Sequence, residues 1–245
     1  MKLLIVDDEP LARERLRALV AELDLDAEIA EAGTGEVALR AVAEQGADVV
    51  LLDIRMPGMD GLEAARHLDL LEQPPAVIFT TAYDRHALDA FDACAVDYLL
   101  KPIRKERLQR ALARAGRLST VQLGGLKAAV PDAAKARTHI TASMRGKLHI
   151  IPVAEVRYFR AEQKYVTVNH PRGQILIEDS LHTLEEEFGE RFLRVHRNAL
   201  VAPQHVVRLE KDEVGHYCVY FRGVDGPVEV SRRLVAGVKR VLKGA

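Results

Sequence analysis

The hydrophobic pattern of this chain changes once, and the change divides its 245 residues into two parts. Up to about residue 118, short apolar runs of the β type alternate with amphipathic helical patterns. Five such units in succession predict a doubly wound α/β fold, a five-stranded parallel sheet with helices on both faces. The runs VVLL and VIF lack alternation, as strands do when both faces of the sheet are covered.

The rest of the chain follows a different pattern. Beyond residue 137, short strand candidates are separated by turn residues, and only SLHTLEEEF and SRRLVAGVKRVL look helical. This pattern predicts a mainly antiparallel β domain. The stretch between the two patterns contains Gly-Gly, Pro and many Ala without an apolar period, which is typical of a linker. We therefore expect domains at residues 1–118 and 138–245, joined by a linker at 119–137.

Composition narrows the classes of function. Acidic side chains outnumber basic ones in the first domain and basic ones prevail in the second, so a polyanion is a candidate partner of the second domain. Cys94 and Cys218 have no CxxC neighbour, and neither a disulfide nor a zinc site is indicated. The chain shows no signal peptide and no long apolar stretch. We expect a cytoplasmic protein without a membrane partner.

Three acids and one lysine follow apolar runs of the first domain. Asp7 and Asp8 follow KLLIV, Asp53 ends VVLLD, and Lys101 follows DYLL. Because sheets of this kind bind ligands outside the carboxyl ends of their strands, we expect these four side chains to converge. The acids suit a Mg²⁺ ion, and the lysine suits a phosphoryl group. The sequence therefore predicts a site that receives a phosphoryl group.

Asp53 is the best candidate phosphoacceptor, because the Pro/Gly loop that follows leaves its strand end open. A carboxylate that attacks a phosphorylated donor forms an acyl phosphate, and a cation held by Asp7 and Asp8 would offset the charge repulsion. The hydroxyl of either Thr80 or Thr81, at the end of another run, could bond to the phosphoryl group. Taken singly, these residues also have structural explanations; Asp8, for example, would serve as a helix N-cap.

The segments VDDEP, LLDIRMPGMDG, TTA and DYLLKP, in this order, resemble the signature of receiver domains of bacterial two-component response regulators. The resemblance covers roughly residues 1–118. It implies that Asp53 is phosphorylated by a sensor histidine kinase. It also implies that Asp8, Asp53 and the backbone carbonyl of Arg55 bind Mg²⁺, with Asp7 acting partly through water.

The same resemblance assigns further roles. Thr81 matches the switch hydroxyl, Tyr98 matches the aromatic residue that changes rotamer, and Lys101 would bind a phosphoryl oxygen through its ammonium group. The Lys101-Pro102 peptide is cis in this family. The spacing from Thr81 to Lys101 is slightly short, which predicts a short fourth helix. We expect a homodimer through the face formed by the helix near Arg85, the last strand and the 104–118 helix. Its charged residues are Asp89, Asp92, Arg104, Lys105, Arg107 and Arg110.

Three polar segments of the second domain suit nucleic acid. Arginine can pair with guanine and asparagine with adenine, and arginines at a helix start oppose the helix dipole and point to an anion. Each segment taken singly is also compatible with a solvated turn. The candidate residues are Lys164 and Tyr165, Arg197 and Asn198, and Arg232 and Arg233.

FLRVHRNALVA, VSRRLVAGVKRVL and the earlier YVTV resemble the LytTR family of DNA-binding domains over roughly residues 138–243. The resemblance implies that the three segments reach successive major grooves of double-stranded promoter DNA. The whole chain is most similar to the alginate-regulator (AlgR-type) members, which join a receiver to this domain. The expected function is that of a phosphorylation-dependent, DNA-binding transcription regulator that is not an enzyme.

Two other classes are less compatible with the residues. A phosphatase of the haloacid dehalogenase type needs a second acid two residues after its nucleophile, where this chain has Arg55. A PilZ-type domain that binds a cyclic dinucleotide would carry RxxxR and D/NxSxxG motifs, which we do not find in this sequence.

Overall fold

The computed structural model describes residues 1–82, 95–118, 136–144, 147–162, 164–224 and 226–244. The chain forms two compact units, Met1–Ala134 and Lys135–Ala245, and each is described by itself. The expected fourth helix, with Asp89, Asp92 and Cys94, and most of the expected linker lie outside the described residues. In the part of the chain that is described, no helix has the length and apolar character needed to cross a membrane.

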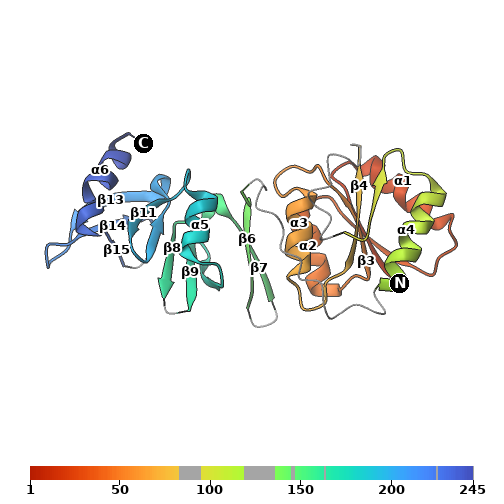
Figure 1. Cartoon of the computed structure of the whole chain (residues 1–245), viewed down its shortest axis with the longest axis horizontal. Helices are drawn as coiled ribbons and strands as arrows, with labels where there is room; N and C mark the ends of the chain where they lie inside the picture. The colour runs from red at the N-terminus through yellow and green to blue at the C-terminus, as the bar shows by residue number, and fades with distance from the viewer. Residues whose placement is uncertain (83–94, 119–135, 145–146, 163, 225, 245) are drawn as a thin grey trace. The chain divides into compact units, whose positions relative to one another are not determined.

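The first unit contains a parallel five-stranded sheet in the order β2-β1-β3-β4-β5. Helices α1 and α4 cover one face and α2 and α3 the other (Figure 1). The doubly wound fold predicted from the sequence is therefore confirmed. The strands are β1 (Lys2–Val6), β2 (Glu28–Ala32), β3 (Val49–Asp53), β4 (Ala76–Thr81) and β5 (Asp97–Leu100). The helices are α1 (Pro10–Ala21), α2 (Gly35–Gln45), α3 (Gly61–Asp69) and α4 (Lys105–Leu118).

Local sequence determines where these helices begin. Pro10 opens α1, where the missing N–H of proline removes nothing from the helix. The side chains of Thr34 and Asp60 cap α2 and α3 by accepting hydrogen bonds from the backbone N–H groups of Val37 and Glu63. Each helix therefore starts shortly after a strand end, which keeps the connection at that edge of the sheet short.

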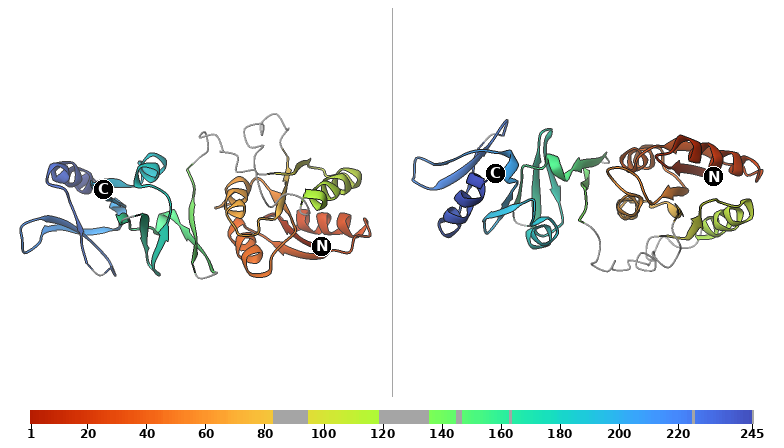
Figure 2. Two further views of the ribbon diagram at one scale, coloured as in Figure 1. Left: turned by 60° about the horizontal axis from the view of Figure 1, so that its bottom comes forward. Right: turned by 90° about the horizontal axis from the view of Figure 1, so that it is seen from above.

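The second unit consists mainly of antiparallel strands, as predicted. A five-stranded sheet in the order β10-β9-β8-β12-β11 lies between the β6–β7 hairpin and the three-stranded sheet β13-β14-β15 (Figure 2). The strands are β6 (His139–Met144), β7 (Lys147–Pro152), β8 (Tyr158–Glu162), β9 (Tyr165–His170), β10 (Gly173–Ile177), β11 (Leu193–His196), β12 (Ala199–Val201), β13 (Val206–Lys211), β14 (Tyr217–Phe221) and β15 (Val228–Glu229). The helices are α5 (Leu181–Phe188) and α6 (Val235–Gly244), with 3₁₀ turns η3 (Val153–Glu155), η4 (Pro203–His205) and η5 (Arg232–Leu234).

Strands β8 and β12 of the five-stranded sheet contribute buried side chains to both of its faces. Successive side chains of a strand point to opposite faces. Phe159 and Leu200 accordingly join the core beneath α5, whereas Tyr158 and Val201 join a second core with β14 and α6. This double burial holds the ends of the strands, and the turns that leave them, in fixed positions.

Arg137 anchors the start of the second unit. Its backbone N–H and guanidinium both bind the carboxylate of Glu187 on α5, and the guanidinium also pairs with Asp179 at 2.7 Å. The sequence placed Arg137 at the end of the linker, whereas the structure groups it with the second unit.

Gly61 lets α3 approach the end of β3 closely. Its backbone N–H bonds to the carbonyl of Ile54 at 2.9 Å, and a Cβ atom built at this position would lie 2.0 Å from the carbonyl oxygen of Asp53. Any side chain here must displace the backbone of a buried strand.

We expect Gly61→Ala to destabilise the first unit by about 1–3 kcal/mol, because overpacking a filled interior shifts its backbone. Gly116→Ala is the matched control. A Cβ at this α4 position meets no atom within 4 Å, so alanine should raise stability by about 0.5–1 kcal/mol through helix propensity. Amide hydrogen exchange of β1 and β3 measures both effects in the whole chain. Equal protection in the two variants would show that the close approach does not matter.

Candidate functional site

The three predicted acids meet at the carboxyl edge of the parallel sheet. β1 and β3 are neighbours in register, so Asp7 and Asp8, which follow β1, lie beside Asp53 at the end of β3. One carboxylate oxygen from each residue lies within 4.8 Å of the others. Asp7 and Asp53 are buried and Asp8 is exposed. The cluster therefore opens to solvent on the side of Asp8.

Lys101 joins this cluster from the end of β5. Its ammonium donates to Asp7 Oδ2 and to Asp53 Oδ1, both at 2.7 Å. The other oxygen of Asp53, Oδ2, accepts the backbone N–H of Arg55 at 2.9 Å. The Lys101-Pro102 peptide is cis, as the receiver resemblance implies. The four side chains that the sequence predicted to converge are thus in one place.

The charges of this cluster do not balance. Burial raises the pKa of Asp53, the bond to Lys101 opposes that rise, and the charge of Asp7 adds to it. Burial would lower the pKa of Lys101, but its hydrogen bonds to Asp53 and Asp7 outweigh that effect, and the pKa rises. Lys101 therefore stays protonated, and the cluster contains one ammonium group and three carboxylates. The excess of negative charge and the set of oxygen ligands suit a hard divalent cation.

Thr81 and Tyr98 lie on the two strands next to this edge. The backbone N–H of Lys101 bonds to the carbonyl of Thr81 at 2.7 Å, which ties the ends of β4 and β5 together. The side chain of Thr81 is buried. Tyr98 is half-buried and stacks on Phe79, with 5.5 Å between the ring centroids. The neighbouring hydroxyl of Thr80 is fully buried and has no hydrogen-bond partner within the described residues.

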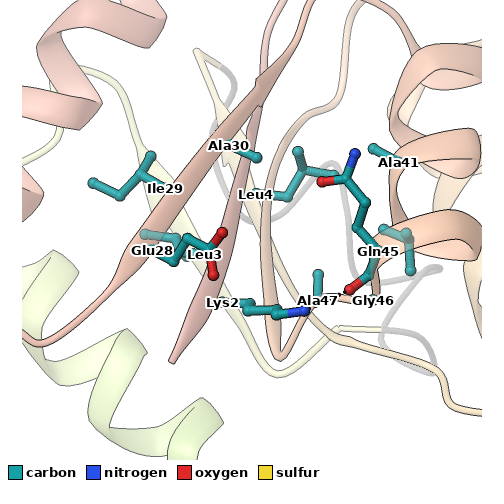
Figure 3. A pocket seen from close by; sticks show the side chains of 11 residues that line it. Lys2, Leu3, Leu4, Glu28, Ile29, Ala30, Ala41, Gln45, Gly46 and Ala47 are labelled. Atoms are coloured by element: carbon teal, nitrogen blue, oxygen red, sulfur yellow. Dashed lines mark hydrogen bonds between the residues drawn. The ribbon is translucent and has the colours of Figure 1, made fainter.

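A separate small pocket, with a volume of about 60 Å³, lies at the opposite edge of the sheet (Figure 3). It is lined by residues at the start of β1 and β2 and at the end of α2. Its basic side chain is already engaged, because Lys2 Nζ donates to the Gln45 carbonyl at 2.7 Å. The acidic cluster at the carboxyl edge, and not this pocket, carries the candidate chemistry.

Two of the three predicted DNA-contacting segments are turns at the same end of the five-stranded sheet. Lys164 and Tyr165 belong to the β8–β9 turn, and Arg197 and Asn198 form the β11–β12 turn. The carbonyl of Asn198 accepts the backbone N–H of Ala161 at 2.8 Å, so the second turn lies against the end of β8.

The third segment adjoins the second. Arg232 and Arg233 lie in η5, and the preceding Ser231 bonds through its backbone N–H to the Val195 carbonyl at 2.8 Å. The two arginines are exposed, as are Lys164, Tyr165 and Arg197, while Asn198 is half-buried. Hydrogen bonds between the elements that carry them thus bring the three predicted segments next to one another in the second unit.

Arg194, one of the basic residues of the FLRVHR stretch, has a positioning role that sequence reasoning did not identify. Its guanidinium donates to the backbone carbonyls of His196 (2.8 Å) and Arg197, and is held in turn by Glu185 on α5 at 2.6 Å. His196 Nδ1 also contacts the side-chain oxygen of Asn198. These bonds fix the shape of the β11–β12 turn before any ligand binds. The only sequence signal was the repeated spacing of basic residues in FLRVHR.

Comparison with known proteins agrees with both resemblances. The family model for the response regulator receiver domain matches residues 3–113, and the model for the LytTr DNA-binding domain matches residues 146–243. The chain is 50% identical to the positive alginate biosynthesis regulatory protein of Pseudomonas aeruginosa, over 99% of both chains. It is 34% identical to the transcriptional regulatory protein BtsR of Escherichia coli, again over 99% of both.

Among solved structures, the response regulator TrrA of Thermotoga maritima in complex with Mg²⁺-BeF is similar to the first unit. It is 33% identical and covers 46% of this chain and 97% of its own, with a TM-score of 0.43. The two family models together span most of the chain, and full-length relatives share both domains. This chain therefore belongs to the LytTR family of response regulators, with a receiver domain followed by a LytTR DNA-binding domain.

Proposed function

We propose that Asp53 accepts a phosphoryl group from the phosphohistidine of a sensor histidine kinase. A carboxylate oxygen of Asp53 forms a bond to phosphorus while the P–N bond of the donor breaks, and the electron pair of that bond stays on the imidazole. The convergence of Lys101 on the buried carboxylates of Asp7 and Asp53 carries this proposal. A protonated lysine at this edge can change its hydrogen-bond partner from a carboxylate to a phosphoryl oxygen while it stays in the acidic cluster.

The residues fit a Mg²⁺ ion, which would lessen the repulsion between the carboxylate and the incoming phosphoryl oxygens. Asp8, Asp53 and the backbone carbonyl of Arg55 would hold it directly, and Asp7 would do so through water. Asp8 is exposed, and one of its carboxylate oxygens lies within 4.8 Å of oxygens of Asp7 and Asp53, so a cation can enter from solvent.

Phosphorylation of Asp53 would be transmitted through Thr81 and Tyr98. The hydroxyl of Thr81 would bind a phosphoryl oxygen and draw the end of β4 toward the site. Tyr98 packs on Phe79 of β4, next to that strand end, and would change rotamer as β4 moves. A shift of this kind selects between two pre-existing states of the receiver.

We further propose that the active receiver forms a homodimer through β5 and α4. Arg107 and Arg114 of α4 pair with Asp97 of β5 at 3.3 and 3.2 Å, so this face already orders charges of both signs. Arg104 and Arg110 are exposed beside them. A two-fold contact sets such a surface against itself and suits this mixture of charges.

Sedimentation measures this dimer. Beryllofluoride, which mimics a phosphoryl group, should shift the protein from monomer toward dimer, because it favours the active state. Arg104→Glu with Arg110→Glu should weaken the shift by placing like charges in the contact, whereas Arg15→Glu on α1 should not. A monomer with and without beryllofluoride would refute the dimer.

The second domain would bind promoter DNA through the three exposed segments. We assign base reading to Arg197 and Arg233, and phosphate contacts to Lys164 and Arg232. Arg197 is the best supported of the four, because Arg194 holds the backbone of its turn rigid. Tyr165 would contact the DNA beside Lys164, and Asn198 beside Arg197.

The phosphoacceptor is tested by substitution. Asp53→Asn should abolish the mass increase that acetyl phosphate and Mg²⁺ produce in the wild-type protein, because an amide cannot form the acyl phosphate. Asp69→Asn, a change at an exposed position at the end of α3, should leave the mass increase intact. Stoichiometric phosphorylation of the Asp53→Asn protein would refute the assignment.

The base-reading residues are tested by binding. Arg197→Ala and Arg233→Ala should each lose about 1–3 kcal/mol of binding free energy toward a duplex selected by the wild-type protein, with little loss toward a shuffled duplex. Lys164→Ala should lower the affinity for both duplexes by the same factor. Titrations over a salt series give these values. Equal losses of Arg197→Ala and Arg233→Ala on both duplexes would make these arginines phosphate contacts instead.

A further inference from the structure

Two lysines converge on one tyrosine beside the recognition segments. Lys239 of α6 donates to the hydroxyl of Tyr217 at 2.9 Å and lies 4.2 Å from the centre of its ring. Lys211, opposite Tyr217 on β13, places its ammonium 5.4 Å from the same ring. Figure 1 shows α6 beside β13 and β14, the elements that supply these residues.

Neither lysine forms an ion pair in the described part of the chain. Glu210 and Asp212, the acids on either side of Lys211, have other contacts. Asp212 accepts the backbone N–H groups of Val214 and His216, and Glu229 faces the ring of His216 at 3.7 Å. The hydrogen bond from Lys239, together with the charges of both lysines, lowers the pKa of Tyr217. The phenol thus lies in a positive field.

The backbone connects this cluster directly to the recognition surface. The carbonyl of Tyr217 accepts the backbone N–H of Val230 at 2.7 Å, and the next residue, Ser231, is bonded to Val195 of β11. Arg232 and Arg233 follow immediately. Tyr217 is therefore hydrogen-bonded to Val230, which precedes Arg232 of η5 by only two residues.

We propose that Lys211, Tyr217 and Lys239 form a binding site for a phosphodiester of the DNA backbone, outside the three segments that face the grooves. The proposal rests on the DNA binding proposed above. An ammonium group has three N–H donors, and Lys239 uses one of them to bond to Tyr217. Both lysines therefore have further N–H groups that can bind an anion. A phosphate between them would accept charge-assisted bonds from two sides. Both ammonium groups lie within 5.4 Å of the centre of the tyrosine ring, which attracts cations without neutralising them.

Arg208 provides the contrast. It also lies over a tyrosine, 4.3 Å from the ring centre of Tyr220, on the same pair of strands. Its guanidinium, however, pairs with Glu210 at 3.0 Å. Both places stack a cation on a tyrosine, but within the described residues Arg208 forms an ion pair, whereas Lys211 and Lys239 form none. Arg208 is therefore a matched control for the loss of a stacked cation.

The experiment compares full-length variants on two duplexes, one selected by the wild-type protein from a random pool and one with the same bases shuffled. Lys239→Met and Lys211→Met should each lower the affinity for both duplexes by the same factor. Each should also flatten the slope of log affinity against log salt by about one unit, since one phosphate contact releases about one counterion. The double variant should flatten it by about two. Arg208→Met should leave the slope unchanged. Thermal unfolding confirms that each variant is folded, and if Lys239→Met is not, Lys211→Met gives the same test.

The outcomes separate the two proposals. If the wild-type protein binds its selected duplex and both lysine variants keep the wild-type salt slope, the phosphate site is refuted while DNA binding stands. A loss confined to the selected duplex would also refute it, because that result means base reading. If the wild-type protein binds no duplex, both proposals fail. Tyr217→Phe, which removes only the hydroxyl that orients Lys239, should weaken both duplexes by less than Lys239→Met does.

Discussion

The receiver site depends on one lysine that is shared by two buried carboxylates. Burying Asp7 and Asp53 side by side is unfavourable, because each loses hydration and each repels the other. Lys101 offsets one of the two charges with bonds of 2.7 Å to both residues, and it leaves the cluster short of positive charge. That deficit defines the chemistry of the site. It suits a cation, and a phosphoryl group on Asp53 would give Lys101 a new oxygen partner.

Much of the receiver site could be predicted from the sequence, because its parts are tied to strand ends. In a parallel sheet the carboxyl ends of all strands meet at one edge, so the positions of Asp7, Asp53 and Lys101 after apolar runs were enough to bring them together. Gly61 was not predictable in the same way. Its importance lies in a distance between α3 and the Asp53 carbonyl, and the sequence pattern contains no information on how closely a helix approaches a strand.

The DNA-facing side shows a different limit. The segments around Lys164, Arg197 and Arg232 were found from their polar side chains and from a resemblance, and hydrogen bonds between strands and turns bring them next to one another. The support beneath that surface was not found. Arg194 reaches back to its own turn and forward to Glu185, and Lys211 meets Lys239 across separate elements. Such contacts depend on the register of the strands and on the rotation of a helix about its axis. Neither is determined by the sequence pattern of short strands until the strands are packed.

Both units use an excess of one charge that the fold itself keeps in place. In the receiver the excess is negative and mostly buried, and the carboxylates are held at the ends of the buried strands β1 and β3. In the LytTR domain the excess is positive and exposed, and it is held by a tyrosine ring and by backbone bonds. Water screens the exposed charges strongly and the buried ones weakly. Salt should therefore weaken mainly the binding of DNA and much less the interactions among Asp7, Asp53 and Lys101. The salt dependence of each step thus distinguishes DNA binding from the chemistry proposed for the receiver.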